Sequence, residues 1–145
     1  MRLLASTDLA LRVLMHLAGK PAQRPLNVEA LAGALGGQSR NHLHKIVQDL
    51  SALGMVRTVR GAGGGVLLAV AVDRIRVGTL VRQLEGDQPI VECFRADGGS
   101  CTLSQGCRLS GFIDAAREDF FRSLDRYTVA DCLPRSDVRP TPLPA

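Results

Sequence analysis

Residues 27–70 read NVEALAGALGGQSRNHLHKIVQDLSALGMVRTVRGAGGGVLLAV, and this stretch decides the fold. Asn27 and Ser39 each precede apolar residues at helical spacing, so they predict two capped helices joined by a short turn that contains glycine. Gly54 marks the end of the second helix. Two such helices are typical of a helix-turn-helix motif, whose second helix enters the major groove of DNA. The buried stripe of that helix is expected to comprise Leu43, Ile46 or Val47, Leu50 and Leu53.

A β-hairpin is expected directly after these helices. Residues 55–60 are rich in β-branched side chains, residues 61–65 are mostly glycine, and residues 66–70 are again apolar. A hairpin that follows a recognition helix is a wing. The glycines do not form a phosphate-binding P-loop, because no Gly-Lys-Ser/Thr follows them and the segment leads into a strand.

Further helices are predicted on both sides of this motif. Residues 6–8 favour the start of a helix, and Gly19 ends it. A short helix is expected around residues 77–81 and a long one over residues 108–127. The apolar face of the long helix should pack on the winged domain, on a second copy of the chain, or on both. That face comprises Leu109, Phe112, Ile113, Ala116, Phe120 and Leu124.

The C-terminal residues predict one more turn and then a tail. Residues 128–131 resemble a capping box with Asp in place of Glu, and the turn that follows holds Cys132. Four prolines without apolar periodicity predict disorder after that point. The fold class is therefore mainly α with a small β-hairpin wing. Its parts are a winged helix-turn-helix over 1–85, a cysteine-containing loop over 86–107, a long helix and short turn over 108–133, and a disordered tail over 134–145.

Composition and charge agree with a small DNA-binding protein. Aromatic residues make up 3% of the chain and Trp is absent, so Leu, Val, Ile and Ala must form the core, which suits packed helices. Residues 1–90 carry 11 Lys and Arg against 6 Asp and Glu, whereas residues 91–145 carry 7 against 8. The positive charge lies where a polyanion such as DNA would bind. Because neither a signal peptide nor a long apolar run is recognisable, we expect a cytoplasmic protein without a membrane span and with reduced thiols.

The candidate DNA-contact residues lie at the start of the recognition helix and in the hairpin. Arg suits guanine edges, Asn suits adenine, and Lys suits phosphate, while Arg in a wing suits the minor groove. Glycine lets the tip of the hairpin approach DNA closely. A merely solvated helix face is the alternative, but the neighbouring basic hairpin favours DNA contact. The candidates are Ser39, Arg40, Asn41, His42 and Lys45 in the helix, and Arg57, Arg60, Gly63 and Gly64 in the hairpin.

Three cysteines lie in the loop before the long helix. Seven residues separate Cys93 from Cys101, and five separate Cys101 from Cys107. These gaps are wider than those of zinc knuckles, but three thiolates from one loop can converge on a larger object such as an iron–sulfur cluster. A fourth ligand is then missing. Cys132 lies 25 residues further on and has no assigned role, and unrelated free thiols remain the alternative.

Several segments together resemble the NsrR family of nitric-oxide-sensitive repressors, within the superfamily of winged-helix iron–sulfur regulators that includes IscR. The resemblance covers about residues 1–133. The segments that carry it are Arg12 to Leu14, Ser39-Arg40-Asn41-His42-Leu43, Arg60-Gly61 with Gly63-Gly64-Gly65, Cys93-Phe94, Cys101, and Cys107-Arg108-Leu109.

The resemblance implies a specific function. Proteins of this family are homodimers that bind a palindromic operator in double-stranded DNA, and the long helix would serve dimerisation. Each subunit holds one cluster, commonly [4Fe-4S] with [2Fe-2S] as the alternative, through three cysteines, here Cys93, Cys101 and Cys107. The fourth ligand is an aspartate on the first helix of the partner, and Asp8 stands at the matching place. Nitrosylation of the cluster would lower operator affinity.

One departure and three alternatives accompany this interpretation. The seven-residue gap between the first two cysteines is longer than the five or so residues usual in the family, although loop closure tolerates added length. A regulator of the same superfamily that uses its cysteines to sense iron–sulfur status, thiol redox state or zinc is one alternative, and a protein-interaction module built on the long helix is another. An enzyme is not expected, because no nucleophile–base set or carboxylate pair stands out.

Overall fold

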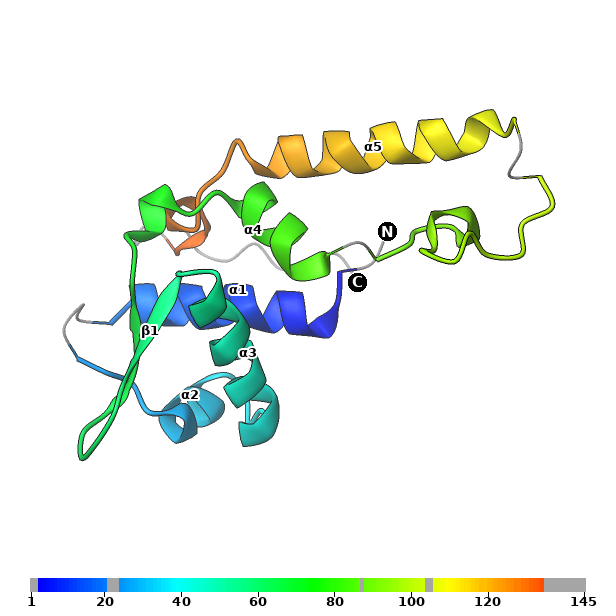
Figure 1. Ribbon diagram of the computed structural model, residues 1–145. Helices are drawn as coiled ribbons and strands as arrows, with labels where there is room; N and C mark the ends of the chain where they lie inside the picture. Colours follow the sequence, from blue (N-terminus) through cyan, green and yellow to red (C-terminus); the bar gives the residue numbers. More distant parts are fainter. Residues whose placement is uncertain (1–2, 21–23, 87, 104–105, 135–145) are drawn as a thin grey trace, which may run out of the picture.

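A computed structural model describes residues 3–20, 24–86, 88–103 and 106–134 of the chain. Figure 1 shows the first three helices, the hairpin and α4 gathered in one body, with α5 running beside α4 and extending beyond it toward the cysteine loop. The helices are α1 (Ala5–Ala18), α2 (Val28–Ala34), α3 (Arg40–Ala52), α4 (Val77–Glu85) and α5 (Arg108–Leu124), the strands are β1 (Val56–Val59) and β2 (Gly65–Leu68), and the short 3-10 turns are η1 (Val72–Arg74), η2 (Glu92–Phe94) and η3 (Ala130–Cys132).

The expected caps are confirmed in part. Asn27 caps α2, because its side-chain oxygen accepts a hydrogen bond of 2.7 Å from the backbone N–H of Ala30. Ser39 occupies the cap position of α3, but its side chain makes no capping hydrogen bond. The predicted start of α1 at Ser6 was wrong by one residue. The helix begins at Ala5, and Leu4 occupies the cap position.

The wing is a two-stranded antiparallel hairpin, as predicted. Its register pairs Val56 with Leu68 and Val59 with Gly65. The hairpin also bonds to the segment before α2, because the backbones of Leu26 and Val66 exchange hydrogen bonds of 3.1 and 2.9 Å. The Leu26–Val66 bridge was not predicted from the sequence, and it anchors the wing to the helix-turn-helix.

The hydrophobic core lies between the helices of the body and the inner face of the hairpin. Most of the predicted helical stripes are buried there, including the stripe of α3 apart from Leu53, which is only partly buried. Burial of this apolar area is the main favourable term in folding. The largest fully buried side chains are Phe121, Leu14, Leu31, Leu43, Ile46, Leu50, Leu80, Val13, Val66, Val81 and Val129.

The long helix packs on the body through Phe121 and through only the C-terminal part of the predicted stripe. Phe121, which lies outside the predicted stripe, is 2% exposed, whereas Leu109 and Phe112 within the stripe are 60% and 61% exposed. Successive helical residues are rotated by about 100°. The side that carries Phe121 therefore faces α4. The predicted stripe is divided: Phe120 and Leu124 near its C-terminal end pack against the core, whereas Leu109 and Phe112 stay uncovered in a single chain. Packing of the uncovered part on a second copy stays a prediction.

The C-terminal turn forms as the sequence predicted. The Asp131 carboxylate accepts a hydrogen bond of 2.8 Å from the backbone N–H of Thr128, and the Thr128 hydroxyl accepts one of 3.4 Å from the backbone N–H of Asp131. Val129 in this turn is buried in the core. The predicted disordered tail, beyond Pro134, lies outside the described residues. In the part of the chain that the structure covers, no helix has the length and apolarity needed to cross a bilayer.

Candidate DNA interface and cysteine loop

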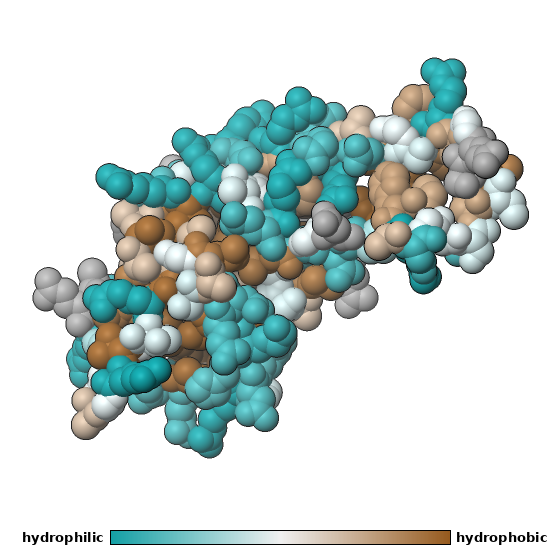
Figure 2. Space-filling model, in the orientation of Figure 1, coloured by the Kyte–Doolittle hydropathy of each residue, from teal (hydrophilic) through white to brown (hydrophobic). Residues whose placement is uncertain are grey.

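The N-terminal half of α3 presents a polar face to solvent. Leu43, Ile46 and Leu50 hold the opposite side of the helix in the core. Figure 1 shows α2, α3 and the tip of the hairpin on the side of the body that faces away from α5. Figure 2 shows mostly hydrophilic surface over α3, with apolar surface toward the hairpin. Of the predicted contact residues in this helix, Ser39, Arg40, Asn41 and Lys45 are exposed and His42 is half-buried.

Two of these cations are held by weak ion pairs. A nitrogen of the Arg40 guanidinium lies 3.2 Å from a carboxylate oxygen of Glu29, and the ammonium of Lys45 lies 3.5 Å from the carboxylate of Asp49. All four side chains are at least 43% exposed, so each pair contributes little to stability. Both cations can therefore exchange these partners for the bases or phosphates of DNA at small cost.

The wing carries two exposed cations. Arg57 and Arg60 are exposed, and within the described residues neither forms a salt bridge. The glycines beside them have a structural role of their own. A Cβ atom at Gly64 would lie 2.3 Å from the carbonyl oxygen of Val59, so only glycine fits there. Gly63 adopts a φ of 78°, which also favours glycine.

The first part of the cysteine loop is a closed turn. The carboxylate of Glu92 accepts a hydrogen bond of 3.0 Å from the backbone N–H of Ser100. Inside this closure, the guanidinium of Arg95 donates two hydrogen bonds of 3.0 and 2.8 Å to the carboxylate of Asp97. This carboxylate also accepts a hydrogen bond from the backbone N–H of Gly99, and the pKa of Asp97 is lowered mainly by the bond from Arg95. The turn therefore folds without using the cysteine side chains.

The four cysteines are free thiols in different settings. Cys93 lies in η2, Cys101 directly follows the closed turn, and Cys107 occupies the cap position of α5, and all three are half-buried. Cys132 is exposed and donates to the carbonyl oxygen of Thr128, and burial, followed by the charge of Asp131, raises its pKa. Within the described ranges, no three His, Cys, Asp or Glu side chains gather closely enough to hold a metal ion. One chain by itself therefore does not bring the three loop thiols together.

Asp8 lies on the exposed side of α1. Its carboxylate pairs with the guanidinium of Arg12 at 2.6 Å, and both side chains are more than half exposed. The buried side of α1 packs on α3 and α4. The helix thus connects an exposed carboxylate to the element that carries the candidate DNA-contact residues.

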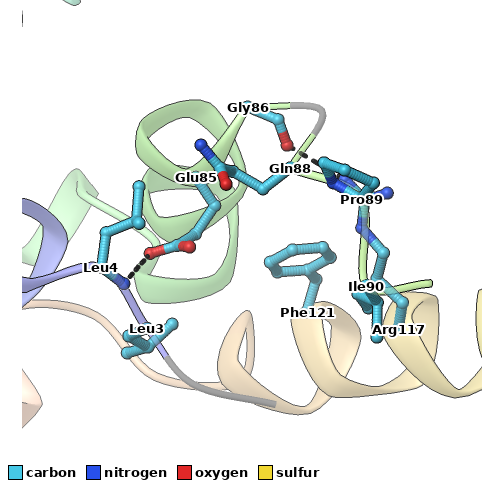
Figure 3. A pocket seen from close by; sticks show the side chains of 9 residues that line it. All are labelled: Leu3, Leu4, Glu85, Gly86, Gln88, Pro89, Ile90, Arg117 and Phe121. Carbon is cyan, nitrogen blue, oxygen red and sulfur yellow. Dashed lines mark hydrogen bonds between the residues drawn. The ribbon is translucent and has the colours of Figure 1, made fainter. Parts of the chain in front are cut away.

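A cavity of about 310 Å³ marks the place where the cysteine loop leaves the body (Figure 3). The backbone N–H of Leu4 donates a hydrogen bond of 3.0 Å to the carboxylate of Glu85, at the end of α4. The guanidinium of Arg117 donates one of 3.0 Å to the carbonyl oxygen of Gly86. The base of the loop is therefore bonded to the start of α1 on one side and to α5 on the other, with the ring of Phe121 beside the cavity.

Apolar side chains remain uncovered at the far end of α5 and in the loop. Leu109 and Phe112 on the helix, Leu103 in the loop and Ile90 near its base are all exposed. Figure 2 shows pale and brown surface at this protruding end of the molecule, beside the hydrophilic surface of α5. Clusters of exposed large apolar side chains commonly mark surfaces that bind another protein.

Comparison with known proteins assigns the chain to a family. The family model of Rrf2, described as an iron-dependent transcriptional regulator, matches residues 3–135. The chain belongs to the Rrf2 family. It is 41% identical over 133 residues to the HTH-type transcriptional regulator NsrR of Geobacillus kaustophilus, with 92% of this chain and 90% of that protein covered. It is 36% identical over 137 residues to NsrR of Halalkalibacterium halodurans, with 94% and 93% covered.

A solved structure agrees with this assignment at the level of the fold. The structure of T. potens IscR superposes with a TM-score of 0.69 at 23% sequence identity, over 91% of this chain and 85% of that one. The predicted winged helix-turn-helix is therefore confirmed, as is the expectation of a regulator rather than an enzyme. This Rrf2 chain is a DNA-binding transcriptional regulator.

The residues of this Rrf2 chain fit an iron–sulfur cluster by the chemistry of their donor atoms. Thiolates are the usual protein ligands of such clusters, and the loop supplies three free, half-buried thiols. The loop is tied to α5 at its base by the hydrogen bond from Arg117 to Gly86, and closed at its first turn by the bond from Ser100 to Glu92, and neither bond uses the thiols. The identity of the individual ligands remains a prediction.

Proposed function

We propose that this Rrf2 chain is a homodimeric repressor that binds a palindromic operator and senses nitric oxide through an iron–sulfur cluster, of the [4Fe-4S] type or, alternatively, [2Fe-2S]. The observation that carries the proposal is a loop with three free thiols in a chain 41% identical to an NsrR regulator. The loop follows α4, whose last residue, Glu85, accepts a hydrogen bond from Leu4 at the start of α1, and α1 packs on the recognition helix.

The DNA contacts follow from the exposed polar groups. Arg40 and Asn41 lie in the first turn of α3, where side chains reach the floor of the major groove, so we assign them to bases. Lys45 and the hydroxyl of Ser39 are suited to phosphates, and His42 to either. Arg57 and Arg60 would contact the backbone or the minor groove from the wing, whose tip Gly63 and Gly64 keep narrow.

The apolar stripe of α5 would bury itself against a second copy. Its exposed residues, with Leu109 and Phe112 foremost, lie on a face that the first copy leaves uncovered. A twofold dimer places two recognition helices in successive major grooves, which lie about 34 Å apart. Since that spacing is set by the geometry of the dimer, a change at the dimer contact changes operator affinity.

Cys93, Cys101 and Cys107 would hold the cluster of one subunit, and Asp8 of the second copy would complete the ligand set. A bound cluster supplies iron that can react with nitric oxide. Asp8 leaves its exposed pair with Arg12 at little cost, because such pairs are weak. α1 packs on α3, so the position of the Asp8 helix biases the position of the recognition helix. Release of Asp8 would therefore alter the docking geometry on DNA.

The first experiment is an anaerobic titration. The purified chain is reconstituted with iron and sulfide, nitric oxide is added, and operator binding is followed by fluorescence anisotropy. We expect a loss of affinity of at least tenfold, and unchanged affinity would reject nitric oxide sensing. A colourless, zinc-loaded protein would favour the thiol or zinc alternative. Cys132→Ser serves as the matched control and should behave as the unaltered chain does.

A second experiment tests the shared ligand set. Chains with Asp8→Ala and chains with Cys101→Ser are mixed to form heterodimers. If Asp8 acts across the dimer, each heterodimer retains one complete site, formed by the cysteines of the Asp8→Ala chain and by Asp8 of the other. Its visible circular dichroism should then show half the signal of the unaltered dimer. If Asp8 acts within its own chain, the heterodimer retains no complete site.

A further inference from the structure

Glu92 and Gly99 close the turn between the first two cysteines by a backbone contact. A Cβ atom at Gly99 would lie 2.5 Å from Cγ and 2.6 Å from the carbonyl oxygen of Glu92, so the two residues touch without room for a side chain. Gly99 also has a φ of 58°, which disfavours other residues. The Glu92 carboxylate then accepts the hydrogen bond from the backbone N–H of Ser100.

The cysteines flank this closure directly. Cys93 follows Glu92 and Cys101 follows Ser100, so each thiol belongs to a residue next to the hydrogen bond. The residues between them do not form an open loop. The backbone N–H of Gly98 donates a hydrogen bond of 2.8 Å to the carbonyl oxygen of Arg95, and the Arg95–Asp97 pair lies within the same turn. The seven-residue gap is thus taken up by a folded turn.

We propose that Glu92 is a positioning residue, whose carboxylate closes the turn and thereby holds Cys93 and Cys101 close enough to act as a pair of ligands. The role of the two thiols as ligands rests on the proposed function, whereas the closed turn that would hold them is present in the chain without iron. Closing the turn in advance removes the entropy cost of bringing the two thiols together. The expected gain in their effective concentration is about fivefold to tenfold, the usual effect of one hydrogen bond.

The first test measures the thiol pair without iron. In full-length chains that carry Cys107→Ser and Cys132→Ser, the equilibrium between the Cys93/Cys101 dithiol and its disulfide is measured in a glutathione redox buffer. That equilibrium gives the effective concentration of the pair. Glu92→Ala should lower it about fivefold to tenfold, and Gly99→Ala should lower it as well, because the added Cβ opens the contact from the other side.

Two further variants make the result specific. Glu92→Gln keeps an oxygen that accepts the Ser100 hydrogen bond, so it should restore the effective concentration to within about twofold of the parent. Asp119→Ala removes an exposed carboxylate of α5 that pairs with Arg122, and should change nothing. Equal effective concentrations in the parent, Glu92→Ala and Gly99→Ala chains would overturn the proposal.

The second test uses the reconstituted, otherwise unaltered chain. Iron loss to a chelator under anaerobic conditions should be several-fold faster for Glu92→Ala than for Glu92→Gln. If the unaltered chain takes up no iron, the proposed function fails while the thiol equilibrium still decides the role of Glu92. If iron is bound and lost at the same rate in all variants, the positioning role is overturned and the proposed function stands.

Discussion

The guanidinium of Arg82 binds the carboxylate of Glu118 through two hydrogen bonds of 2.5 and 2.8 Å and lies 4.4 Å from the centre of the Phe121 ring. These contacts join α4 to α5 beside the only fully buried side chain that α5 contributes within the described residues. The hydrogen bond from Arg82 is the main cause that lowers the pKa of Glu118, and the same bond raises the pKa of Arg82. A charged carboxylate therefore contributes to the attachment of the long helix, beside the burial of Phe121.

Glu118→Gln should lower stability at neutral pH and have little effect in acid. A group whose pKa is lowered by folding stabilises the folded chain above its unfolded pKa, about 4.3 for Glu. That contribution is lost as the pH falls through the lowered folded value. The difference in urea midpoint between the parent and Glu118→Gln should therefore be largest near pH 7 and shrink below about pH 4.3. Because both side chains are about 40% exposed, the effect should be modest.

The control for this measurement is Asp119→Asn, which removes the exposed pair with Arg122 within α5. It should change the urea midpoint little, since the pair does not join two elements. If the difference in urea midpoint between the parent and Glu118→Gln stayed constant from pH 7 to pH 3, the charged form of Glu118 would not be the source of the stabilisation.

Arg40→Ala should weaken operator binding by about 1–3 kcal/mol and relax the base preference at one position in each half-site. Lys45→Ala should instead weaken binding to all sequences and reduce the salt dependence of affinity by about one unit of slope. Anisotropy titrations on operator variants at several salt concentrations separate the two effects.

Glu29→Gln serves as a control for the Arg40 variant. It removes the ion-pair partner of Arg40 without removing the cation, so operator affinity should stay equal or rise. A loss of affinity as large as that of Arg40→Ala would mean that binding needs the intact Arg40–Glu29 pair. Arg40 would then not exchange Glu29 for DNA.

Gly64→Ala should disrupt the tip of the wing. The added Cβ would meet the carbonyl oxygens of Val59 at 2.3 Å and Gly61 at 2.9 Å, both of which are backbone atoms. We expect a loss of about 1–3 kcal/mol in the free energy of unfolding, together with weaker operator binding. Ala62→Ser, at an exposed position of the same tip, should leave both quantities near the parent values, and chemical denaturation beside anisotropy provides the readout.

Phe112→Asp should weaken self-association. The ring is 61% exposed in a single chain, and its burial against a second copy would contribute about 1.5–3 kcal/mol. Sedimentation equilibrium should show a dimer for the parent and a dissociation constant raised at least tenfold for the variant. Gly111→Asp places the same charge on the exposed side of α5 opposite the stripe, where an added side chain meets nothing in the part of the chain that the structure describes, and should remain dimeric. Equal dissociation constants for both variants would place the dimer contact elsewhere.

Features encoded within a few neighbouring residues could be predicted from the sequence. Asn27 caps α2 by reaching a backbone N–H three residues away, and the Thr128–Asp131 box works over the same distance. The polar face at the start of α3 and the glycine-rich wing follow from local periodicity in the same way. These local patterns were sufficient for the helix-turn-helix, the hairpin and the set of candidate DNA contacts.

Contacts between distant residues were decided only by the tertiary structure. The Glu85 carboxylate accepts a hydrogen bond from the backbone N–H of Leu4 at the start of α1, across 81 residues of sequence. Leu26 joins the wing across 40 positions. Apolar periodicity showed that α5 has a face to bury, yet it could not show that Phe121 would meet α4 while Leu109 and Phe112 stayed exposed. Helical spacing fixes which side chains share a face, whereas the partner of each face depends on how all the elements pack together.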